Sequence, residues 1–346
     1  MRVSTGDFLL SCKTIDFGEV ALSKKERAFY ERLNNELLSL CRSMPESAQT
    51  DSMLFLMRYS GIRPGDALDF FASYYPPIWS ILYWLCHRYS LLARPLTRSD
   101  VADAVSAQSM AMFLHSLDDH LIDGQVSTSP LTLLLRSQAW TMMNRSFTSL
   151  AEGIPEGAKT VNGFIDDYYS SFHTSEEAKS LDGYCALFRR QMGILMVSPV
   201  LLSMKMKGTC DFTNDIEIAF GSFGIAWRLL DDIMDIEDDM EKGSHSSIYL
   251  CLPEKVRTVW NNDAGRGRSA NTGSKNIVLN HVLEHGIIEK IKKRICAELD
   301  GAASIVEAYK LKGLAREFRC LAYPLANSKK TVEEDNGRMG IPLAKK

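Results

Sequence analysis

The sequence has no closely paired cysteines. Its eight cysteines are scattered over 346 residues without a single CxxC pair, at positions 12, 41, 86, 185, 210, 251, 296 and 320. This spacing argues against a zinc site and against a disulfide framework. Reduced and mostly buried thiols are typical of cytosolic proteins, so we expect a cytoplasmic location.

The chain also lacks an excess of charge of either sign. Its 40 lysines and arginines nearly balance 43 aspartates and glutamates, which leaves a net charge of −3. Such a chain has no basic field to attract nucleic acid, so we expect no nucleic-acid partner. With 45% hydrophobic and 24% charged residues, it has the composition of a globular protein with a large core.

Long apolar runs are missing as well. The longest apolar-rich stretches lie near Pro76–Cys86 and Gly193–Met204. Both are shorter than the roughly 20 residues that span a bilayer. The first 20 residues carry acidic groups and no sufficient apolar run for a signal peptide. We therefore expect no transmembrane segment.

Strand-like alternation is absent, whereas helical periodicity recurs along the chain. Ser23–Cys41, Leu131–Leu150 and Leu181–Met204 are each predicted as one helix, the first of them capped by Ser23. We predict an all-α fold in which residues 23–328 form a single large helical bundle.

Three segments of the chain are predicted to lie outside this helical pattern. Residues 1–22 carry no clear period and are expected to form a loose N-terminal arm. Residues 329–346 are expected to form a flexible C-terminal tail. The polar stretch Trp260–Asn276 is rich in Gly, Ser and Asn and predicts a surface loop.

The most informative stretch is residues 221–243, where carboxylates gather on one side of a predicted helix. Asp231, Asp235 and Asp239 are spaced i, i+4, i+8 and stack on one face, with Asp232 beside them. Like charges at this spacing destabilise an isolated helix, so we expect a cation to lie beside this acidic stripe. Carboxylate oxygens on a rigid helix suit Mg²⁺, which binds one or two carboxylates together with substrate phosphates.

A second acidic cluster lies far upstream. It contains Asp118 and Asp119, and Asp123 follows one helical turn after Asp119. Each cluster alone is compatible with a solvated acidic face. Because both follow apolar helical stretches, together they predict two carboxylate groups that face each other across a helical cavity.

The two clusters resemble the aspartate-rich motifs of the all-trans isoprenyl diphosphate synthases, the polyprenyl synthetase family of class I isoprenoid enzymes. Asp231-Asp232-Ile-Met-Asp235 matches the family's DDxxD, and Asp118 to Asp123 reads DDxxxD, one residue longer than the commonest form. The resemblance covers roughly residues 66–326 and implies a bundle of the isoprenoid synthase type with a central cavity. It also implies a homodimer.

The resemblance assigns roles to these aspartates. It implies that Asp118, Asp119, Asp231 and Asp232 act in catalysis. It further implies that three Mg²⁺ ions bind around an allylic diphosphate. The implied ligands of these ions are Asp118, Asp119, Asp123, Asp231, Asp232, Asp235 and Asp239.

Other residues fall where the family binds the diphosphate. Arg190 or Gln191 stands where the family carries a Lys-Thr pair, and Trp227-Arg228 replaces the usual Phe-Gln before DDxxD. Lys242 follows the acidic stripe and offers a further cation. Arg190, Gln191, Arg228 and Lys242 are thus candidate diphosphate ligands, with a surface position as the alternative for Arg190 and Lys242.

Soft and aromatic residues are candidates for the cavity lining. Phe113 lies five residues before Asp118, where the family places a residue that limits chain length. Met192, Phe223 and Trp227 are the other candidate pocket residues, and aromatic faces stabilise cations. A plain core role is the alternative for each.

Two departures from the family affect the isopentenyl diphosphate subsite. The family's GKxxRP stretch corresponds to Phe71-Ala-Ser-Tyr-Tyr-Pro76, which contains neither cation. The Arg pair after the first motif is also missing from Gly124–Pro130. A diphosphate in a partly dry site needs charge-assisted partners, so isopentenyl diphosphate should bind poorly.

Three functions are compatible with this pattern. The first, which we expect, is a terpene synthase that ionises one prenyl diphosphate and then cyclises or eliminates. The second is a chain-elongating prenyltransferase, or one with another acceptor, which would need cations from elsewhere in the chain. The third is a non-catalytic subunit of a heteromeric synthase, which the two intact motifs argue against.

Overall fold

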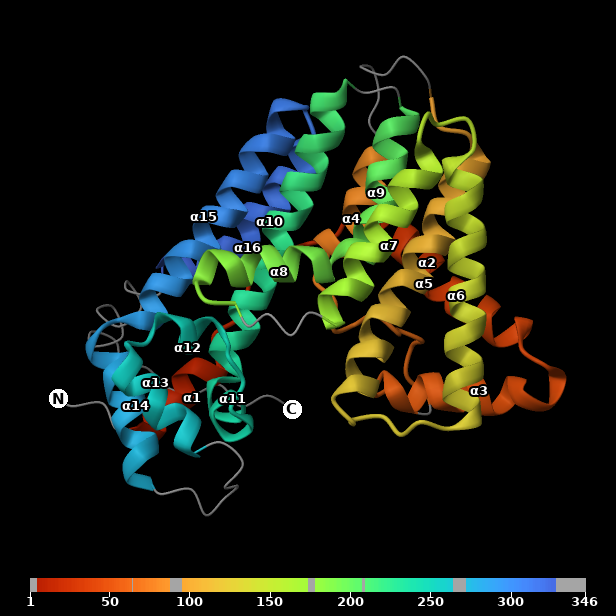
Figure 1. Ribbon diagram of the computed structural model, residues 1–346. Coiled ribbons are helices and arrows are strands. Elements are labelled where there is room, and N and C mark those ends of the chain that lie inside the picture. Colours follow the sequence, from red (N-terminus) through yellow and green to blue (C-terminus); the bar gives the residue numbers. More distant parts are fainter. Residues whose placement is uncertain are drawn as a thin grey trace, which may run out of the picture.

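Sixteen helices and no strand make up the part of the chain that the computed structural model describes, residues 5–63, 65–87, 95–173, 178–206, 209–263 and 272–327 (Figure 1). The predicted all-α class is thereby confirmed. The helices are α1 (Thr5–Lys13), α2 (Lys24–Ser43), α3 (Glu46–Tyr59), α4 (Pro77–Cys86), α5 (Arg98–Ile122), α6 (Pro130–Ala151), α7 (Gly157–His173), α8 (Leu181–Gln191), α9 (Gly193–Lys205), α10 (Cys210–Met234), α11 (Ile236–Lys242), α12 (Ser247–Cys251), α13 (Glu254–Asp263), α14 (Thr272–Glu284), α15 (Ile287–Ala308) and α16 (Lys312–Asn327).

Two long helices, α5 and α10, carry the aspartate segments at their C-terminal ends. α5 packs on α2, α6 and α9, whereas α10 packs on α9, α8 and α15. In Figure 1 both helices run downward, α5 in the right half of the bundle and α10 in the left, where α8 crosses α10. The two acidic ends therefore reach the same level of the molecule.

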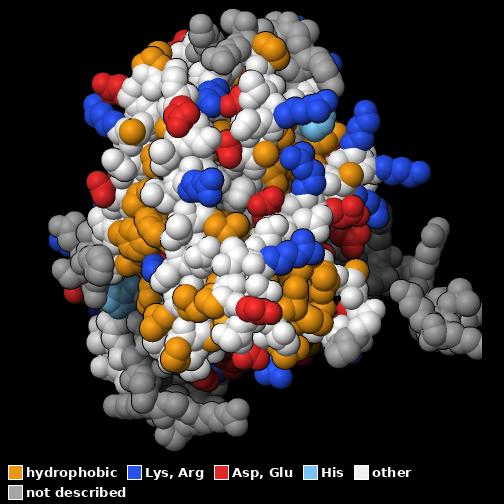
Figure 2. Space-filling view, turned by 90° about the vertical axis from the view of Figure 1, so that its right-hand side faces the viewer, with side chains coloured by type: hydrophobic (Ala, Val, Ile, Leu, Met, Phe, Trp, Pro, Cys, Tyr) orange, Lys and Arg blue, Asp and Glu red, His pale blue; other side chains and the backbone are white. Residues whose placement is uncertain are grey.

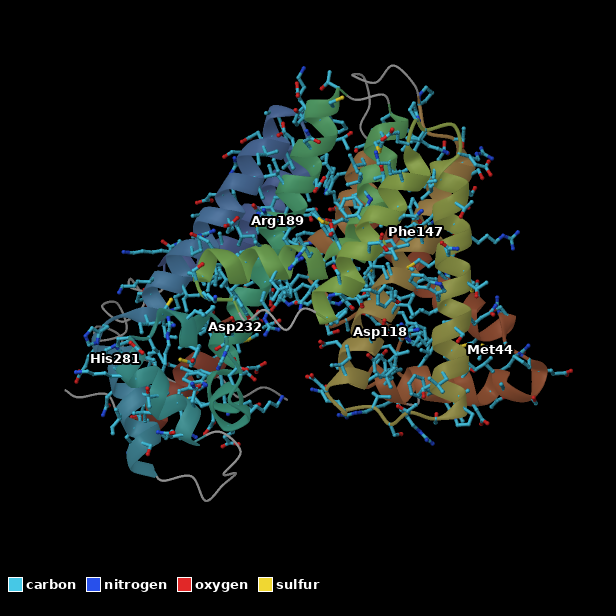
Figure 3. All side chains as sticks on the ribbon, in the orientation of Figure 1. Met44, Asp118, Phe147, Arg189, Asp232 and His281 are labelled. Atoms are coloured by element: carbon cyan, nitrogen blue, oxygen red, sulfur yellow. The ribbon has the colours of Figure 1, made fainter. Side chains whose placement is uncertain are left out.

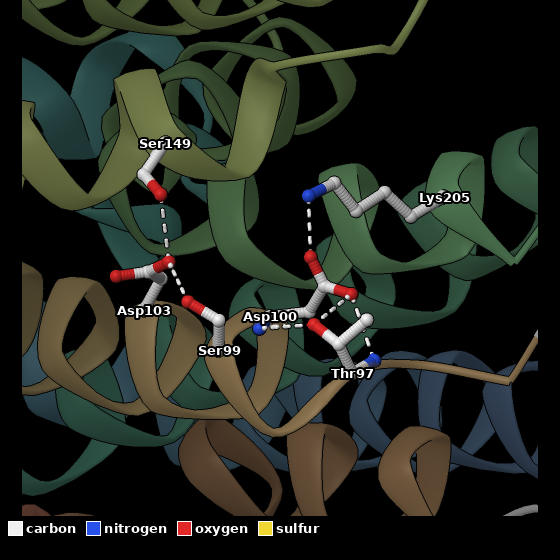
Figure 4. Close-up of polar contacts among 6 residues, drawn as sticks. All are labelled: Thr97, Ser99, Asp100, Asp103, Ser149 and Lys205. Atoms are coloured by element: carbon white, nitrogen blue, oxygen red, sulfur yellow. Dashed lines mark hydrogen bonds and ion pairs between the residues drawn. The ribbon is translucent and has the colours of Figure 1, made fainter.

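A polar network fixes the N-terminal end of α5 (Figure 4). The side chain of Thr97 accepts a hydrogen bond from the Asp100 backbone, and the Asp100 carboxylate accepts one from the Thr97 backbone at 2.8 Å. This is a capping box, which satisfies free N–H groups at the helix start. Lys205 of α9 pairs with Asp100, and Ser149 of α6 donates to Asp103 at 2.8 Å. These bonds link α5 to α6 and α9, so they help fix where its far end lies.

The helix predicted over Leu181–Met204 is broken. α8 ends at Gln191, α9 begins at Gly193, and their axes differ by 68°. A Cβ atom on Gly193 would lie 2.6 Å from the carbonyl oxygen of Phe164, so only glycine allows α9 to approach α7 this closely. Among the described residues no single helix is long and apolar enough to cross a membrane; the bent pair α8–α9 passes that test by length and composition only.

The segment predicted as a loose N-terminal arm contains α1. Phe8 and Cys12, one turn apart, are buried against the rest of the bundle, and α1 packs on α10, α11 and α14. The prediction was wrong because two apolar side chains at i and i+4 are enough to dock a short helix. The predicted tail, residues 329–346, lies outside the described residues.

The loop predicted at Trp260–Asn276 is also shorter than expected. Trp260 is fully buried within α13, and α14 already begins at Thr272. Residues 264–271 lie outside the described part of the chain. Polar composition alone overestimated the length of the loop, because the buried Trp260 ring anchors the start of the segment.

Hydrophobic side chains are visible on the face shown in Figure 2, which is the right-hand side of Figure 1. On α3 and α6, which lie on that side, Leu54, Leu133 and Leu134 are exposed at 43%, 49% and 39%. Large exposed apolar groups on neighbouring elements are common where proteins associate. The homodimer stays a prediction.

Candidate active site

A cavity of about 780 Å³ lies between the C-terminal ends of α5 and α10. α8, α11, the end of α7 and the residues that precede α4 form the rest of its walls. Of the seven aspartates implied as metal ligands, five line this cavity: Asp119, Asp123, Asp231, Asp235 and Asp239. Two segments far apart in the sequence therefore face one space, as the pattern of acidic residues predicts.

The other two aspartates, Asp118 and Asp232, are buried outside the lining and each is held by an arginine. Arg136 donates from Nε to Oδ1 of Asp118 at 2.5 Å and from Nη2 to Oδ2 at 2.9 Å. The Nε atom of Arg228 lies 3.0 Å from Oδ1 of Asp232, whose Oδ2 accepts the Ser247 backbone N–H at 2.8 Å. Figure 3 shows the two aspartates on different sides of the space between the helices. Their oxygens are already engaged, so they anchor the helix ends.

These contacts change which aspartate the first aspartate-rich motif begins with. Asp119 and Asp123 are four residues apart, as are Asp231 and Asp235, and all four line the cavity. Counted from Asp119, the first segment has the ordinary length, with His120 at the second position of the motif. The extra residue is Asp118. The sequence alone could not separate two adjacent aspartates, because the arginine that binds one of them comes from α6.

Four carboxylates that face the cavity have raised pKa values. Burial and, to a smaller extent, the neighbouring carboxylates raise the pKa of Asp231 to about 7, although Arg228 opposes them. Burial and the nearby Asp232 raise the pKa of Asp239 to about 7. The pKa values of Asp119 and Asp235 are also raised, mainly by burial and by a neighbouring carboxylate. Their crowding disfavours the charged forms, which a bound cation would favour.

Among the described lining residues, two side chains carry a fixed positive charge, Arg228 and Lys242. Arg228 lies over the Tyr184 ring, 5.8 Å from its centroid, and donates from Nε to the Tyr184 hydroxyl at 2.6 Å. Gln191 also lines the cavity, whereas Arg190 is exposed and lies outside the lining. The expectation that Arg190 meets a bound diphosphate is therefore not supported, because Arg190 points about 100° away from Gln191 around α8.

Solved structures of prenyl synthases share this arrangement of helices. A geranylgeranyl pyrophosphate synthase from Corynebacterium glutamicum, complexed with isoprenyl diphosphate and magnesium, superposes with a TM-score of 0.59 at 13% identity, over 86% of this chain and 99% of that one. A heptaprenyl diphosphate synthase from Staphylococcus aureus has a TM-score of 0.64 at 10% identity, over 86% and 98%. The chain has the polyprenyl synthase fold. No protein-family profile and no curated protein matches the chain.

In this polyprenyl synthase fold, the donor set suits Mg²⁺. Carboxylate oxygens from two rigid helices are its usual protein ligands. Oδ2 of Asp239 is buried without a hydrogen-bond donor among the described residues. No group of three His, Cys, Asp or Glu in the described residues forms a ready metal site. Each ion would thus take one or two carboxylates, with its remaining ligands from substrate or water.

One wall of the cavity is aromatic. The Trp227 ring meets the Tyr74 and Tyr75 rings edge to face, with centroids 5.6 and 6.2 Å apart. The His115 ring lies 6.3 Å from Trp227. Trp227 was expected in the lining from the sequence, and it lines the cavity together with these three neighbours.

The other expected pocket residues lie behind this wall. Met192 and Phe223 are fully buried outside the lining, and Phe223 stacks on Trp227 with centroids 6.4 Å apart. Phe113 borders a separate side pocket of about 60 Å³ that shares Tyr74 with the main cavity. The role of Phe113 in limiting chain length stays a prediction.

The sequence analysis missed three residues that the structure places at the site. Arg136 binds Asp118, and Tyr184 donates to Oδ1 of Asp232 at 2.9 Å. His115 lines the cavity, and burial lowers its pKa to about 4, so the imidazole is neutral at pH 7. Only His115 had a signal, because it lies one helical turn before Asp119.

Proposed function

We propose that the chain is a Mg²⁺-dependent isoprenoid enzyme that binds a prenyl diphosphate in the cavity between α5 and α10 and ionises it. The observation that carries this proposal is the meeting of two Asp-x-x-x-Asp segments on one cavity. The fold supports it, since a C. glutamicum synthase of this fold was solved with isoprenyl diphosphate and magnesium.

The cavity residues divide into ion ligands and diphosphate ligands. Bound Mg²⁺, three ions in this proposal, would neutralise the diphosphate and make it a competent leaving group. Arg228 and Lys242 would contact diphosphate oxygens directly, and the Arg228 guanidinium suits two oxygens at once. Gln191 would donate from its amide. The proposed ion ligands are Asp119, Asp123, Asp231, Asp235 and Asp239.

The reaction follows from this arrangement. The allylic C–O bond breaks, and its electron pair leaves with the diphosphate. A π bond then attacks the allylic cation, and the resulting cation loses a proton to the released diphosphate. Tyr74, Tyr75 and Trp227 present aromatic rings to the cavity, whose faces stabilise positive charge. They also replace water near the cation, which limits its premature capture.

The fate of the prenyl group is the finer question. The structural neighbours are geranylgeranyl, heptaprenyl and decaprenyl diphosphate synthases. They favour prenyl transfer to a second substrate over the terpene synthase reaction that the sequence led us to expect, and we propose prenyl transfer first. Cyclisation or elimination of a single substrate is the second candidate. One observation favours it: Tyr75, which lines the cavity, stands where the family's motif carries Arg, and Ala72 stands where it carries Lys.

Product analysis tests the proposal. The protein is incubated with Mg²⁺ and a C10, C15 or C20 prenyl diphosphate, each with and without isopentenyl diphosphate. A longer diphosphate supports chain elongation, and a hydrocarbon from one substrate supports the second candidate. Chelation of Mg²⁺ should abolish either product. A chain that neither binds nor converts any prenyl diphosphate would refute the proposal and favour a non-catalytic subunit.

A further inference from the structure

The aromatic wall of the cavity carries no charged side chain among the described residues. Ser73, Tyr74 and Tyr75 contribute to it from the segment before α4, His115 from α5 and Trp227 from α10. The rings contact one another through Trp227, so they form one continuous surface. This surface differs from the rest of the lining, where five aspartates and two cations lie.

The two tyrosine hydroxyls of this wall are already engaged. The Tyr74 hydroxyl donates to the carbonyl oxygen of Met112 at 2.7 Å, and the Tyr75 hydroxyl donates to Oδ1 of Asp16 at 2.6 Å. Neither hydroxyl proton is available to a ligand. The same bonds hold both rings in place, so the wall offers fixed aromatic surface.

The two cations of the cavity stand elsewhere and suffice for one diphosphate at most. Arg228 is shared with Asp232 and Tyr184, which leaves Lys242 as the other fixed positive charge in the described lining. A second diphosphate would bring about three more negative charges beside five aspartates. Burying such a group without charge-assisted partners is costly.

We infer that this wall binds an uncharged, π-rich group, an alkene or an arene, in place of a second diphosphate. The inference rests on the proposed ionisation of a prenyl diphosphate in this cavity. Among the candidate fates of the prenyl group it selects cyclisation or transfer to a neutral acceptor, and not elongation with isopentenyl diphosphate. Aromatic rings pack favourably on the flat apolar face of an alkene or arene. Two sources offer this chemistry, the distal double bond of the bound prenyl chain and a separate neutral acceptor.

Calorimetry of the full-length protein with Mg²⁺ tests the inference. Geranyl thiolodiphosphate, an unreactive allylic analogue, is titrated first, and isopentenyl diphosphate is then titrated into the loaded protein. We expect one equivalent of the analogue to bind and isopentenyl diphosphate to give no saturable heat. Binding of a second diphosphate to the loaded protein would overturn the inference alone. Failure of the analogue to bind would overturn the proposed function itself.

A substitution in the wall makes the test sharper. Ser73→Arg adds a cation to the exposed edge of the wall, and Ser73→Gln adds comparable length without charge. If missing charge excludes the second diphosphate, Ser73→Arg should bind isopentenyl diphosphate at least about tenfold more tightly than Ser73→Gln, or about 1.4 kcal/mol. Equal affinities in the two variants would contradict the inference.

The source of the neutral group is then read from products. Geranyl or farnesyl diphosphate is supplied alone and with indole as a neutral arene. A cyclic hydrocarbon from the diphosphate alone assigns the wall to the same chain. A prenylated indole assigns it to a separate acceptor. Both results support the inference, whereas a chain-elongated diphosphate from isopentenyl diphosphate as the sole product opposes it.

Discussion

The two aspartate segments share a pattern and differ in how they are held. At the end of α5, Asp118 is bound by Arg136, which comes from α6 and lies outside the cavity lining. At the end of α10, Asp232 is bound by Arg228 from the same helix, and Arg228 itself lines the cavity. Arg136 only holds its aspartate, whereas Arg228 also faces the space proposed for the substrate.

This difference shows that the two aspartates of an adjacent pair have separate roles. In each pair one carboxylate faces the cavity, and its neighbour, pointing about 100° away around the helix, reaches an arginine. The pairs are used in opposite order: Asp119 is the second of its pair, and Asp231 is the first. Loss of a cavity-facing member and loss of an anchored member should therefore have different effects.

The largest effect is expected from the cavity-facing carboxylates. Asp119→Asn and Asp231→Asn each remove a proposed ion ligand and keep the side-chain shape. We expect kcat/KM to fall on the order of 10³-fold, about 4 kcal/mol of transition-state stabilisation, with the melting temperature unchanged or higher. Steady-state kinetics at saturating Mg²⁺, with circular dichroism for the fold, measure both.

The matched control is Asp118→Asn, one residue away. It keeps the cavity-lining aspartates and weakens the pairing with Arg136. We therefore expect the free energy of unfolding to fall, and kcat/KM to fall much less than in Asp119→Asn. If Asp118→Asn abolished turnover while Asp119→Asn remained active, the first motif would have to be counted from Asp118, as the sequence alone suggested. Such a result would remove the distinction between facing and anchoring carboxylates.

A smaller loss of activity is expected from substitution of Arg228. Its proposed roles in binding the substrate and in holding Asp232 can be tested separately. Arg228→Met removes a cavity cation and leaves Asp232 with Tyr184 and the Ser247 backbone as partners. We expect kcat/KM to fall about 10²-fold and stability to fall by about 2 kcal/mol. Arg228→Lys retains the charge, so it should recover part of the activity. Equal activities of the Lys and Met variants would argue against a role of this charge in substrate binding.

The class of fold and the meeting of the two acidic segments could be predicted from the sequence, because helical periodicity and carboxylate spacing are local. The orientation of single side chains could not. The positions of Asp118 and Asp232 depend on Arg136 and Tyr184, which come from α6 and α8 and carry no local signal. The bend at Gly193 depends on a backbone contact with α7.

Arg136 is expected to matter for stability and less for activity. Arg136→Met leaves the buried Asp118 without its cation, and Asp118 is only 6% exposed. We expect the free energy of unfolding to fall by about 2 to 3 kcal/mol, measured by urea denaturation, with a loss of kcat/KM below that of Arg228→Met. The double variant Arg136→Met with Asp118→Asn should recover part of this loss, because no buried charge is left unpaired. Strict additivity of the two changes would count against the proposed anchor.

The smallest effect concerns Glu317, a buried carboxyl of α16 that has no arginine partner among the described residues. It accepts hydrogen bonds from Ser80 and from Nε1 of Trp84, the latter at 2.5 Å, and the carboxyl of Glu26 lies nearby. Burial raises the pKa of Glu317 to about 7 from an ordinary value of 4.5. The folded state therefore holds a proton that the unfolded state releases, so this contribution is full below pH 4.5 and is lost as the pH rises towards 7.

We expect unfolding experiments to show stability falling by roughly 1 to 2 kcal/mol between pH 5 and pH 8 from this group. Glu317→Gln, which cannot titrate, should remove that part of the slope and gain relative stability as the pH rises. The arginine-held carboxylates should behave differently, because Asp118→Asn and Asp232→Asn replace charges that the fold pairs, and each should destabilise the protein at pH 8. If the Glu317→Gln variant kept the full wild-type dependence of stability on pH, Glu317 would not be the group that titrates. Its hydrogen bonds to neutral donors would then not distinguish it from the arginine-held carboxylates.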